Sequence, residues 1–349
     1  MDTTGPAPGA RHAVLLGAAG FVGRNVCRAL LDAGWRVTAV VRGDASPEPG
    51  CATVRLDAAR VPSAALTAVL DRAPDLVVNA AGALWGADDT QLVEGNVVLV
   101  ERLVAAVAAL PRRVRLVHIG SAYEYGDQPP GPPLTEDLPE RPVSRYAQTK
   151  LAGTRIVTGA VAAGRVDAVV VRISTAVGPW APPQSLLGGL ARQFAGGAAT
   201  VELPPLSGER DFVDVRDVSA AVLCAAAAPA VPAVVNVGGD RLVPVADVVD
   251  LLVRCAGGDR VVRRAAAGRR RDGRDAGVAA RPLDVRLARR ELAWRPVRPI
   301  GDAVDALWRH ARLTGGGTDP DREGAKPAGF RGGTAPIPSF AANGDTAHG

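Results

Sequence analysis

A tyrosine and a lysine four residues apart, Tyr146 and Lys150, form the pair with the clearest chemical potential in the sequence. Lys150 and Lys326 are the only lysines, and the other cationic side chains are arginines. On a helix, residues four apart share a face, so the ammonium can lie beside the phenol. A free phenol has a pKa of about 10, and a nearby cation lowers that pKa. We therefore expect Lys150 to lower the pKa of Tyr146 and make it a proton-transfer group. The alternative is an exposed pair on an amphipathic helix.

A glycine-rich turn near the start of the chain gives this pair a context. The apolar run His12–Leu16 predicts a buried parallel strand, Gly17, Gly20 and Gly23 follow it, and a periodic helix leads to a second strand at Trp35–Val41. In a strand–turn–helix–strand unit, such a turn lets the backbone approach a pyrophosphate, and the helix N-terminus supplies N–H groups. The turn therefore predicts a dinucleotide site.

Strand and helix patterns alternate as far as Arg172 and become looser beyond Gly178. This order predicts an α/β fold: a Rossmann doubly wound parallel sheet with a smaller C-terminal substrate-binding lobe. We expect residues 11–177 to form the NAD(P)-binding domain, with some later strands and helices returning to it, and residues 178–313 to form mainly the lobe. Residues 314–349 are rich in Gly, Pro and Asp without periodicity, which predicts a disordered tail.

Several segments together resemble the extended branch of the short-chain dehydrogenase/reductase superfamily, the NAD-dependent epimerase/dehydratase family. The resemblance rests on the Gly-x-x-Gly-x-x-Gly spacing combined with Tyr146 and Lys150, and on a strand that ends at Ser121. It extends to Arg172–Pro179, where Thr175 stands in place of the usual Asn, and to the Arg-Asp-Phe-Val-Asp motif after Glu209. In all it covers residues from about 13 to 312.

The resemblance implies a role for each matching residue. Tyr146 would donate a proton to a substrate carbonyl, Ser121 would hydrogen-bond the same oxygen, and Lys150 would also bind the nicotinamide ribose. The Ser121 hydroxyl could instead cap a turn. The implied cofactor contacts are Gly17, Ala19, Gly20, Phe21, Val22, Gly23, Arg42, Asp57, Ala58, Ala80, Ala81, Gly82, Asn96 (expected to open a helix), Tyr146, Lys150 and Ile173. The implied substrate contacts are Ser121, Ala122, Tyr123, Thr175, Gln184 and Arg210, with Arg210 on a diphosphate or in a structural salt bridge.

The segment after Ser121 bears on the reaction. Ala122 and Tyr123 stand where dTDP-glucose-type 4,6-dehydratases place Asp-Glu, whereas Glu124 leaves a GDP-mannose-type dehydratase open. The Gly-Ser-x-x-Glu-Tyr-Gly form is most similar to GDP-4-keto-6-deoxymannose reductases. We therefore expect NAD(P)H-dependent reduction of a nucleoside-diphosphate (NDP) 4-keto-6-deoxyhexose. The alternatives are an NDP-sugar epimerase with tightly bound NAD and, less favoured, a dehydratase or a non-catalytic dinucleotide sensor.

The end of the second strand bears on the choice of cofactor. Arg42 follows Val41 directly, and an arginine there suits the 2′-phosphate of NADP, so NADPH is favoured. NAD is possible if Asp44 serves the ribose hydroxyls and Arg42 stacks on adenine.

Composition narrows the remaining functions. A net charge of +5 is modest, and the arginine-rich stretch 260–274 lacks interleaved aromatics, so we expect a solvated loop or help with a diphosphate, not nucleic-acid binding. The absence of long apolar stretches argues against a membrane protein. Four distant cysteines without metal spacing indicate reduced thiols, no metal and a cytoplasmic protein. We also expect a homodimer through the helices carrying Asn96 and Tyr146, with close approach allowed by Ala105, Ala106, Ala108, Ala147, Ala152 and Gly153.

Overall fold

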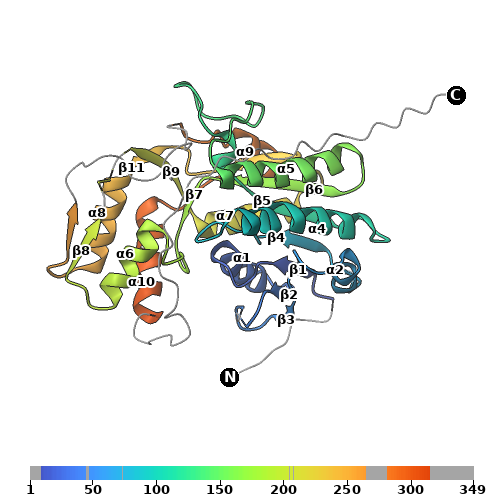
Figure 1. The fold of residues 1–349 in the computed structure, drawn as a ribbon, viewed down its shortest axis with the longest axis horizontal. Helices are drawn as coiled ribbons and strands as arrows, with labels where there is room; N and C mark the ends of the chain where they lie inside the picture. Colours follow the sequence, from blue (N-terminus) through green and yellow to red (C-terminus); the bar gives the residue numbers. More distant parts are fainter. Residues whose placement is uncertain are drawn as a thin grey trace. The chain divides into compact units, whose positions relative to one another are not determined.

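A seven-stranded parallel sheet organises the part of the chain that the structure describes (Figure 1). The computed structural model describes residues 9–44, 47–72, 74–203, 205–206, 208–264 and 281–314. The strand order is β10-β6-β5-β4-β1-β2-β3. The strands are β1 (His12–Leu16), β2 (Arg36–Val41), β3 (Ala52–Arg55), β4 (Leu76–Asn79), β5 (Arg115–Ser121), β6 (Asp167–Ile173) and β10 (Val234–Val237). This confirms the predicted doubly wound Rossmann fold.

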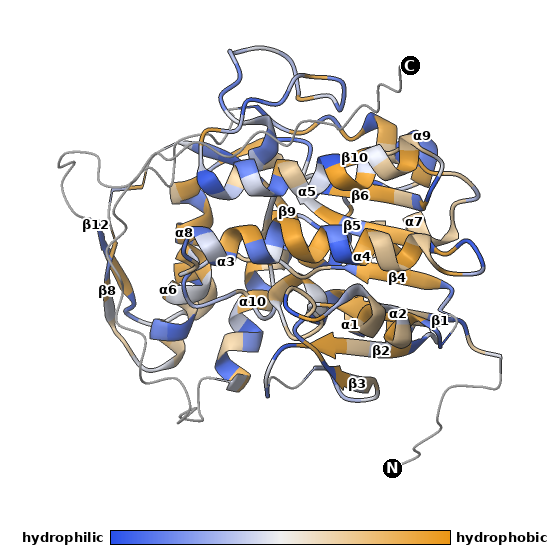
Figure 2. Ribbon diagram, turned by 45° about the vertical axis from the view of Figure 1, so that its right-hand side comes forward, coloured by the Kyte–Doolittle hydropathy of each residue, from blue (hydrophilic) through white to orange (hydrophobic). Residues whose placement is uncertain are grey.

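Continuous apolar sequence explains why the central strands are buried on both faces. Every residue of β1 and of β4 is buried, as expected for a parallel sheet covered by helices on both sides. One face carries α1 (Phe21–Asp32), α7 (Val215–Ala227) and α9 (Arg286–Leu292). The opposite face carries α2 (Ser63–Leu70), α4 (Leu99–Ala108) and α5 (Arg145–Ala162). The orange, apolar sides of these helices and the orange strands in Figure 2 mark the two cores.

Two smaller sheets and three helices surround a separate core. The sheets are β11 (Leu242–Pro244)–β9 (Glu209–Asp214)–β7 (Thr175–Val177) and β12 (Val261–Arg264)–β8 (Thr200–Leu203). The helices α6 (Leu186–Ala195), α8 (Val245–Ala256) and α10 (Ile300–Thr314) contribute Phe194, Leu252 and Trp308 to that core. β10 joins the large sheet although it follows β7 to β9 in the chain, and β7 joins a smaller sheet. The division into domains 11–177 and 178–313 stays a prediction.

Part of the arginine-rich stretch is structural. The Arg260 guanidinium lies over the rings of Phe194 and Trp308 and donates to the carbonyls of Ala256 and Gly257 at the end of α8. The expectation of a solvated loop is therefore wrong at Arg260, because a guanidinium can cover apolar rings while its N–H groups cap a helix end. Residues 265–280, like the tail after Thr314, lie outside the described residues, and Thr314 itself ends α10.

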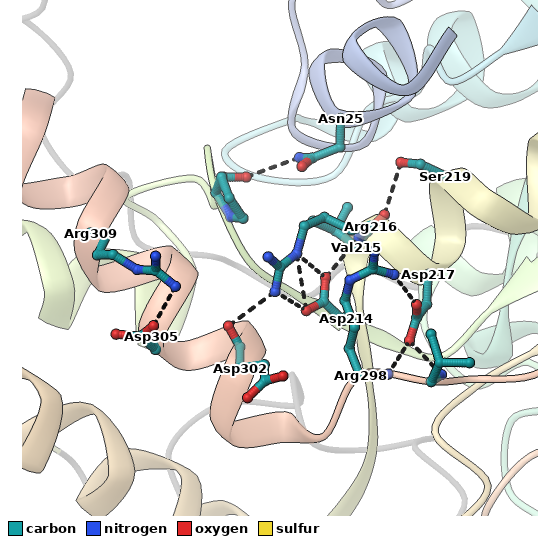
Figure 3. A network of polar contacts seen from close by, with 12 residues as sticks. Asn25, Asp214, Val215, Arg216, Asp217, Ser219, Arg298, Asp302, Asp305 and Arg309 are labelled. Carbon is teal, nitrogen blue, oxygen red and sulfur yellow. Dashed lines mark hydrogen bonds and ion pairs between the residues drawn. The ribbon is translucent and has the colours of Figure 1, made fainter. Parts of the chain in front are cut away.

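A polar network joins α7 to the segment before α10 (Figure 3). The buried Asp217 carboxylate accepts the backbone N–H groups of Val297 at 3.0 Å and Arg298 at 2.9 Å, and it also accepts the Arg298 guanidinium. One turn earlier, Asp214 pairs with Arg216, which donates to the carbonyl of Asp302 at 3.0 Å. Contacts between residues about 80 positions apart in the chain thus attach the last helix to α7.

Small residues on α4 and α5 pack within the chain rather than remaining free for a partner. A Cβ on Gly153 would collide with the Asn96 carbonyl oxygen, and Ala106 and Ala147 are buried. Ala105 and Ala108 stay exposed. Homodimerisation therefore stays a prediction, with less support from this stripe than the sequence suggested.

Two expectations from composition concern membrane-spanning helices and the state of the cysteines. Within the described ranges, no helix has the length and apolar character needed to cross a bilayer. The cysteines Cys27, Cys51, Cys224 and Cys255 are free thiols.

Candidate active site

The start of α5 and the end of β5 bring the predicted catalytic residues together. Ser144 caps α5 by accepting the Ala147 N–H at 3.2 Å, and this places Tyr146 and Lys150 in the first two turns. Ser121 is the last residue of β5 and pairs in register with Ile173 of β6. All of these positions lie at the carboxyl edge of the sheet, where open α/β folds bind ligands.

Lys150 is buried and anchored to the neighbouring strand. Its Nζ donates to the Ile119 carbonyl oxygen at 2.6 Å. Burial lowers the pKa of Lys150, and the negative charge of Glu124 partly opposes this. The ammonium therefore has a fixed position at Ile119, two residues before Ser121 on the same strand.

Tyr146 departs from the expected pKa shift. Although it is only partly buried as a residue, burial of its phenol raises its pKa, and a hydrogen bond with the Ser121 side chain lowers it only in part. The prediction that Lys150 lowers this pKa is wrong in the described structure, because the ammonium is bound to Ile119 and desolvation of the phenolate outweighs the favourable contacts. At neutral pH the phenol is therefore in its acid form. The ring of Tyr123 meets it edge-on, with centroids 5.9 Å apart.

Ser121 serves both as a site residue and as a cap. Its Oγ accepts the Tyr123 N–H at 3.3 Å and so begins the short helix η2 (Ala122–Tyr125). The Glu124 side chain in turn accepts the Ser121 N–H at 2.7 Å. The capping role considered for this serine is thus present, and its role at a substrate oxygen stays a prediction.

The turn after β1 has the shape that a pyrophosphate requires. Gly17 has φ +75°, and a Cβ there would overlap the backbone of Ala81. A Cβ on Gly23 would collide with the Gly17 carbonyl. Gly20 begins α1 without a side-chain cap among the described residues, which leaves helix N–H groups available for an anion. These residues therefore fit a dinucleotide.

Asn79 fixes the neighbouring loop that contains Ala80, Ala81 and Gly82. Its Oδ1 accepts the Ala81 N–H at 3.1 Å, and its Nδ2 donates to Nδ1 of the buried His118 at 3.0 Å. Burial, with a smaller effect of Lys150, holds the pKa of His118 well below its usual value, so the ring is neutral. A buried Asn–His pair thus connects the loop to β5.

Asn96 lies within a helix instead of opening one. It belongs to the π-helical turn η1 (Glu94–Val98), which continues α3 (Asp89–Val93) into α4. Its side chain accepts the Ala83 N–H at 3.0 Å and donates to Thr149 on α5 at 3.1 Å. The expected helix start is therefore wrong in detail: Asp88, three residues before Gln91, forms the capping box.

The residues predicted to contact the adenosine part of a cofactor are distributed along the same edge. Arg42 is exposed directly after β2, and Asp57 follows β3 and turns the chain by accepting the Ala59 N–H at 3.2 Å. Asp44 is exposed, with an oxygen 3.8 Å from Nε of Arg55. The remaining predicted cofactor residues, Ala19, Phe21, Val22 and Ala58, belong to α1 and to the turns that follow β1 and β3.

A small cavity lies next to the segment that follows Ser121. It is lined by Ala122, Tyr123, Leu134, Ser174, Thr175, Asp211, Arg281 and Leu283. Three predicted substrate residues, Ala122, Tyr123 and Thr175, are among them. Gln184 is exposed and Arg210 lies on the strand face opposite Asp211, so neither lines the cavity.

Sequence reasoning missed Asp211 and Arg281. Asp211 accepts the N–H groups of Gly239 at 2.6 Å and Leu283 at 2.9 Å, and burial raises its pKa to about 6 against these contacts. Arg281 donates to the carbonyls of Pro132 and of Pro129, the latter at 3.2 Å, which holds the proline-rich loop beside the cavity. A signal existed for Asp211, since a charged residue at a buried strand position needs partners.

A Rossmann sheet with a glycine turn, beside a buried Ser–Tyr–Lys constellation, defines an NAD(P)-dependent oxidoreductase. Residues 13–238 match the model of the NAD dependent epimerase/dehydratase family, and the chain belongs to that family, in its extended short-chain dehydrogenase/reductase branch. It is 41% identical to dTDP-6-deoxy-L-talose 4-dehydrogenase (NAD(P)(+)) of Kitasatospora kifunensis, over 87% of this chain and 97% of that protein.

Solved structures share the fold. MoeE5 in complex with UDP-glucuronic acid and NAD is similar with a TM-score of 0.75 and 25% identity, covering 86% of this chain and 99% of that one. RMD from Pseudomonas aeruginosa, complexed with NADPH, gives a TM-score of 0.73 at 21% identity, covering 87% and 98%. The second likeness shows the fold alone.

Proposed function

We propose that the protein reduces the 4-keto group of an NDP-4-keto-6-deoxyhexose to a hydroxyl, with NADPH favoured over NADH. The relative from Kitasatospora kifunensis is named for oxidation at position 4 of a dTDP-6-deoxyhexose, which is the reverse of this step. This supports a dTDP-linked sugar as the first substrate to test, although the motif after Ser121 is most similar to reductases of a GDP-linked sugar.

The placement of Tyr146 beside Ser121, on the helix that also carries Lys150, carries the proposal. Carbonyl reduction needs an acid at the carbonyl oxygen. A phenol with the ordinary pKa of about 10 is protonated at neutral pH, and burial raises the pKa of Tyr146 further. Bound NADPH would supply the hydride. Tyr146 would pass its proton to the oxygen as charge develops there, and the Ser121 hydroxyl would donate a hydrogen bond to the same oxygen. Lys150 would hold the nicotinamide ribose.

The surroundings of Glu124 argue against a dehydratase. A dehydratase needs an acid/base pair that reaches the sugar, yet Ala122 and Tyr123 occupy those positions. Glu124 is fully buried and accepts Ser121 N–H, Thr154 Oγ1 and Arg172 Nε. Arg172 Nη2 is also 3.0 Å from its Oε2, so the roughly four acceptor sites of this carboxylate are all used within the protein.

Two exposed residues after β2 support NADPH. Asp44 lies beside Arg55, which leaves Arg42 as the charged side chain directly at the strand end. A guanidinium can bind a 2′-phosphate through two N–H groups. On the substrate side, Arg210 and Gln184 stay as predicted diphosphate and substrate contacts, while Ser174, Asp211 and Arg281 offer polar groups near the sugar.

Oxidation of reduced nicotinamide, followed by absorbance, tests the proposal. The purified protein is mixed with NADPH or NADH and with enzymatically prepared dTDP- and GDP-4-keto-6-deoxyhexoses. We expect stoichiometric consumption with one sugar and loss of activity in Tyr146→Phe. No consumption, together with a copurifying nicotinamide and an isomerised sugar, would establish the epimerase instead. If neither occurs, the 4-keto sugar is the wrong substrate class.

A further inference from the structure

A buried carboxylate, Glu124, connects three elements that build the active site. Its Oε1 accepts the Ser121 N–H at 2.7 Å, at the end of β5. Its Oε2 accepts Thr154 Oγ1 on α5 at 2.9 Å and Arg172 Nε on β6 at 3.0 Å. The same α5 carries Tyr146 and Lys150. One side chain therefore sets the distance between the serine turn and the tyrosine helix.

The partner of this carboxylate is fully buried as well. Arg172 lies over the ring of Tyr125, with its guanidinium carbon 4.4 Å from the centroid, and it donates to Glu140 at 3.1 Å. The Tyr125 hydroxyl donates to Asn236 on β10 at 2.8 Å. Two charges removed from water cost several kcal/mol each, and apolar residues of similar volume often stabilise a fold as well or better. Stability alone therefore does not account for this pair.

The charge of Glu124 also acts on the catalytic groups. It contributes to the raised pKa of Tyr146, after burial and Tyr123, and it favours the charged form of Lys150 against burial. A phenol and an amine have these forms at neutral pH without any neighbour, so the carboxylate reinforces the protonated phenol and the charged lysine.

We propose that Glu124 is a positioning residue: its carboxylate holds the Ser121 turn against α5 and β6 and places one negative charge near Tyr146 and Lys150. The effect on turnover rests on the proposed reduction. The effect on the phenol does not, because it exists without a sugar substrate.

Glu124→Gln keeps the shape and removes the charge. Because loss of the anion lowers the pKa of Tyr146, the alkaline decline of the reduction rate should begin at lower pH than in the wild type. We expect kcat to fall roughly 100-fold, the loss that a misplacement of catalytic groups by about 1 Å can cause, with little change in KM. Ionisation of the Tyr146 phenol, followed by ultraviolet absorbance against a Tyr146→Phe background, should shift to lower pH in the same direction.

Glu140→Gln is the matched control, because Glu140 accepts from the same guanidinium but does not contact Ser121. It should leave the phenol titration and the pH profile close to wild type. If Glu124→Gln leaves Arg172 uncompensated and does not fold, Glu124→Gln with Arg172→Met removes both charges. A folded variant, single or double, with wild-type kcat and an unshifted phenol titration would overturn the proposal, as would equal effects of Glu124→Gln and Glu140→Gln. If none of the sugars is reduced but the phenol titration shifts, the reductase assignment fails while the role of Glu124 in setting the phenol stands.

Discussion

Replacing Asp217 by alanine should weaken the attachment of the last helix. In the wild type the Asp217 carboxylate accepts the N–H groups of Val297 and Arg298 and the Arg298 guanidinium. Two backbone N–H groups without an acceptor cost about 1–3 kcal/mol each, and losing a partly exposed ion pair adds up to about 1 kcal/mol. Val297 is 62% exposed, so water can reach its N–H, and the lower half of this range applies. We expect the free energy of unfolding to fall by about 3 kcal/mol.

Urea denaturation followed by tryptophan fluorescence measures this loss, with the m-value unchanged. Asp217→Asn keeps one oxygen for the backbone and should cost about 1 kcal/mol. Asp305→Asn is the matched control, because Asp305 and Arg309 form an exposed pair one turn apart on α10 and should contribute no more than about 0.5 kcal/mol. The reasoning is refuted if Asp217→Ala stays within about 0.5 kcal/mol of wild type, or if Arg298→Ala costs as much as Asp217→Ala.

Three further predictions concern the site. Gly23→Ala should lower NADPH affinity at least tenfold, measured by nicotinamide fluorescence, because the added Cβ collides with the Gly17 carbonyl. An unchanged affinity would contradict the role of the glycine turn in binding the dinucleotide. Ser121→Ala should lower kcat of reduction about 100-fold while NADPH affinity stays the same; an unchanged kcat would remove Ser121 from the reaction. The pKa of Asp211 is raised to about 6 in the folded protein, so the folded state binds more protons than the unfolded chain between about pH 4 and 6. The free energy of unfolding should therefore fall as pH rises through that window, by up to about 3 kcal/mol. Asp211→Asn should abolish this decline in urea titrations, and a pH dependence identical to that of the wild type would count against the shift.

The large sheet and the catalytic constellation could be predicted because their signals are local. Buried parallel strands such as β4 are continuous apolar runs. The glycine turn and Ser121 lie at the ends of such strands, and Tyr146 and Lys150 are only four residues apart. A helix period then suffices to place Tyr146 and Lys150 on one side of α5.

What escaped prediction depends on partners far apart in the chain. The Lys150 ammonium binds Ile119, and Glu124 binds Arg172, and neither pairing follows from spacing. The sequence nevertheless indicated that Arg172 has an acidic partner, because a charged residue inside the apolar strand β6 needs an acid nearby. The pKa of Tyr146 was missed for the same reason, because desolvation is a property of the packed interior and not of the Tyr-x-x-x-Lys motif.

The place of β10 has a consequence for biosynthesis. During synthesis β6 leaves the ribosome well before β10. The edge of β6 that pairs with β10 therefore stays unpaired until Val234–Val237 emerges. Exposed edges of this kind template association with other chains, and N-terminal parts of a protein begin to fold first. An exchange of residues 11–177 between related chains would therefore leave β6 without this neighbour unless the exchange also carried the short strand Val234–Val237.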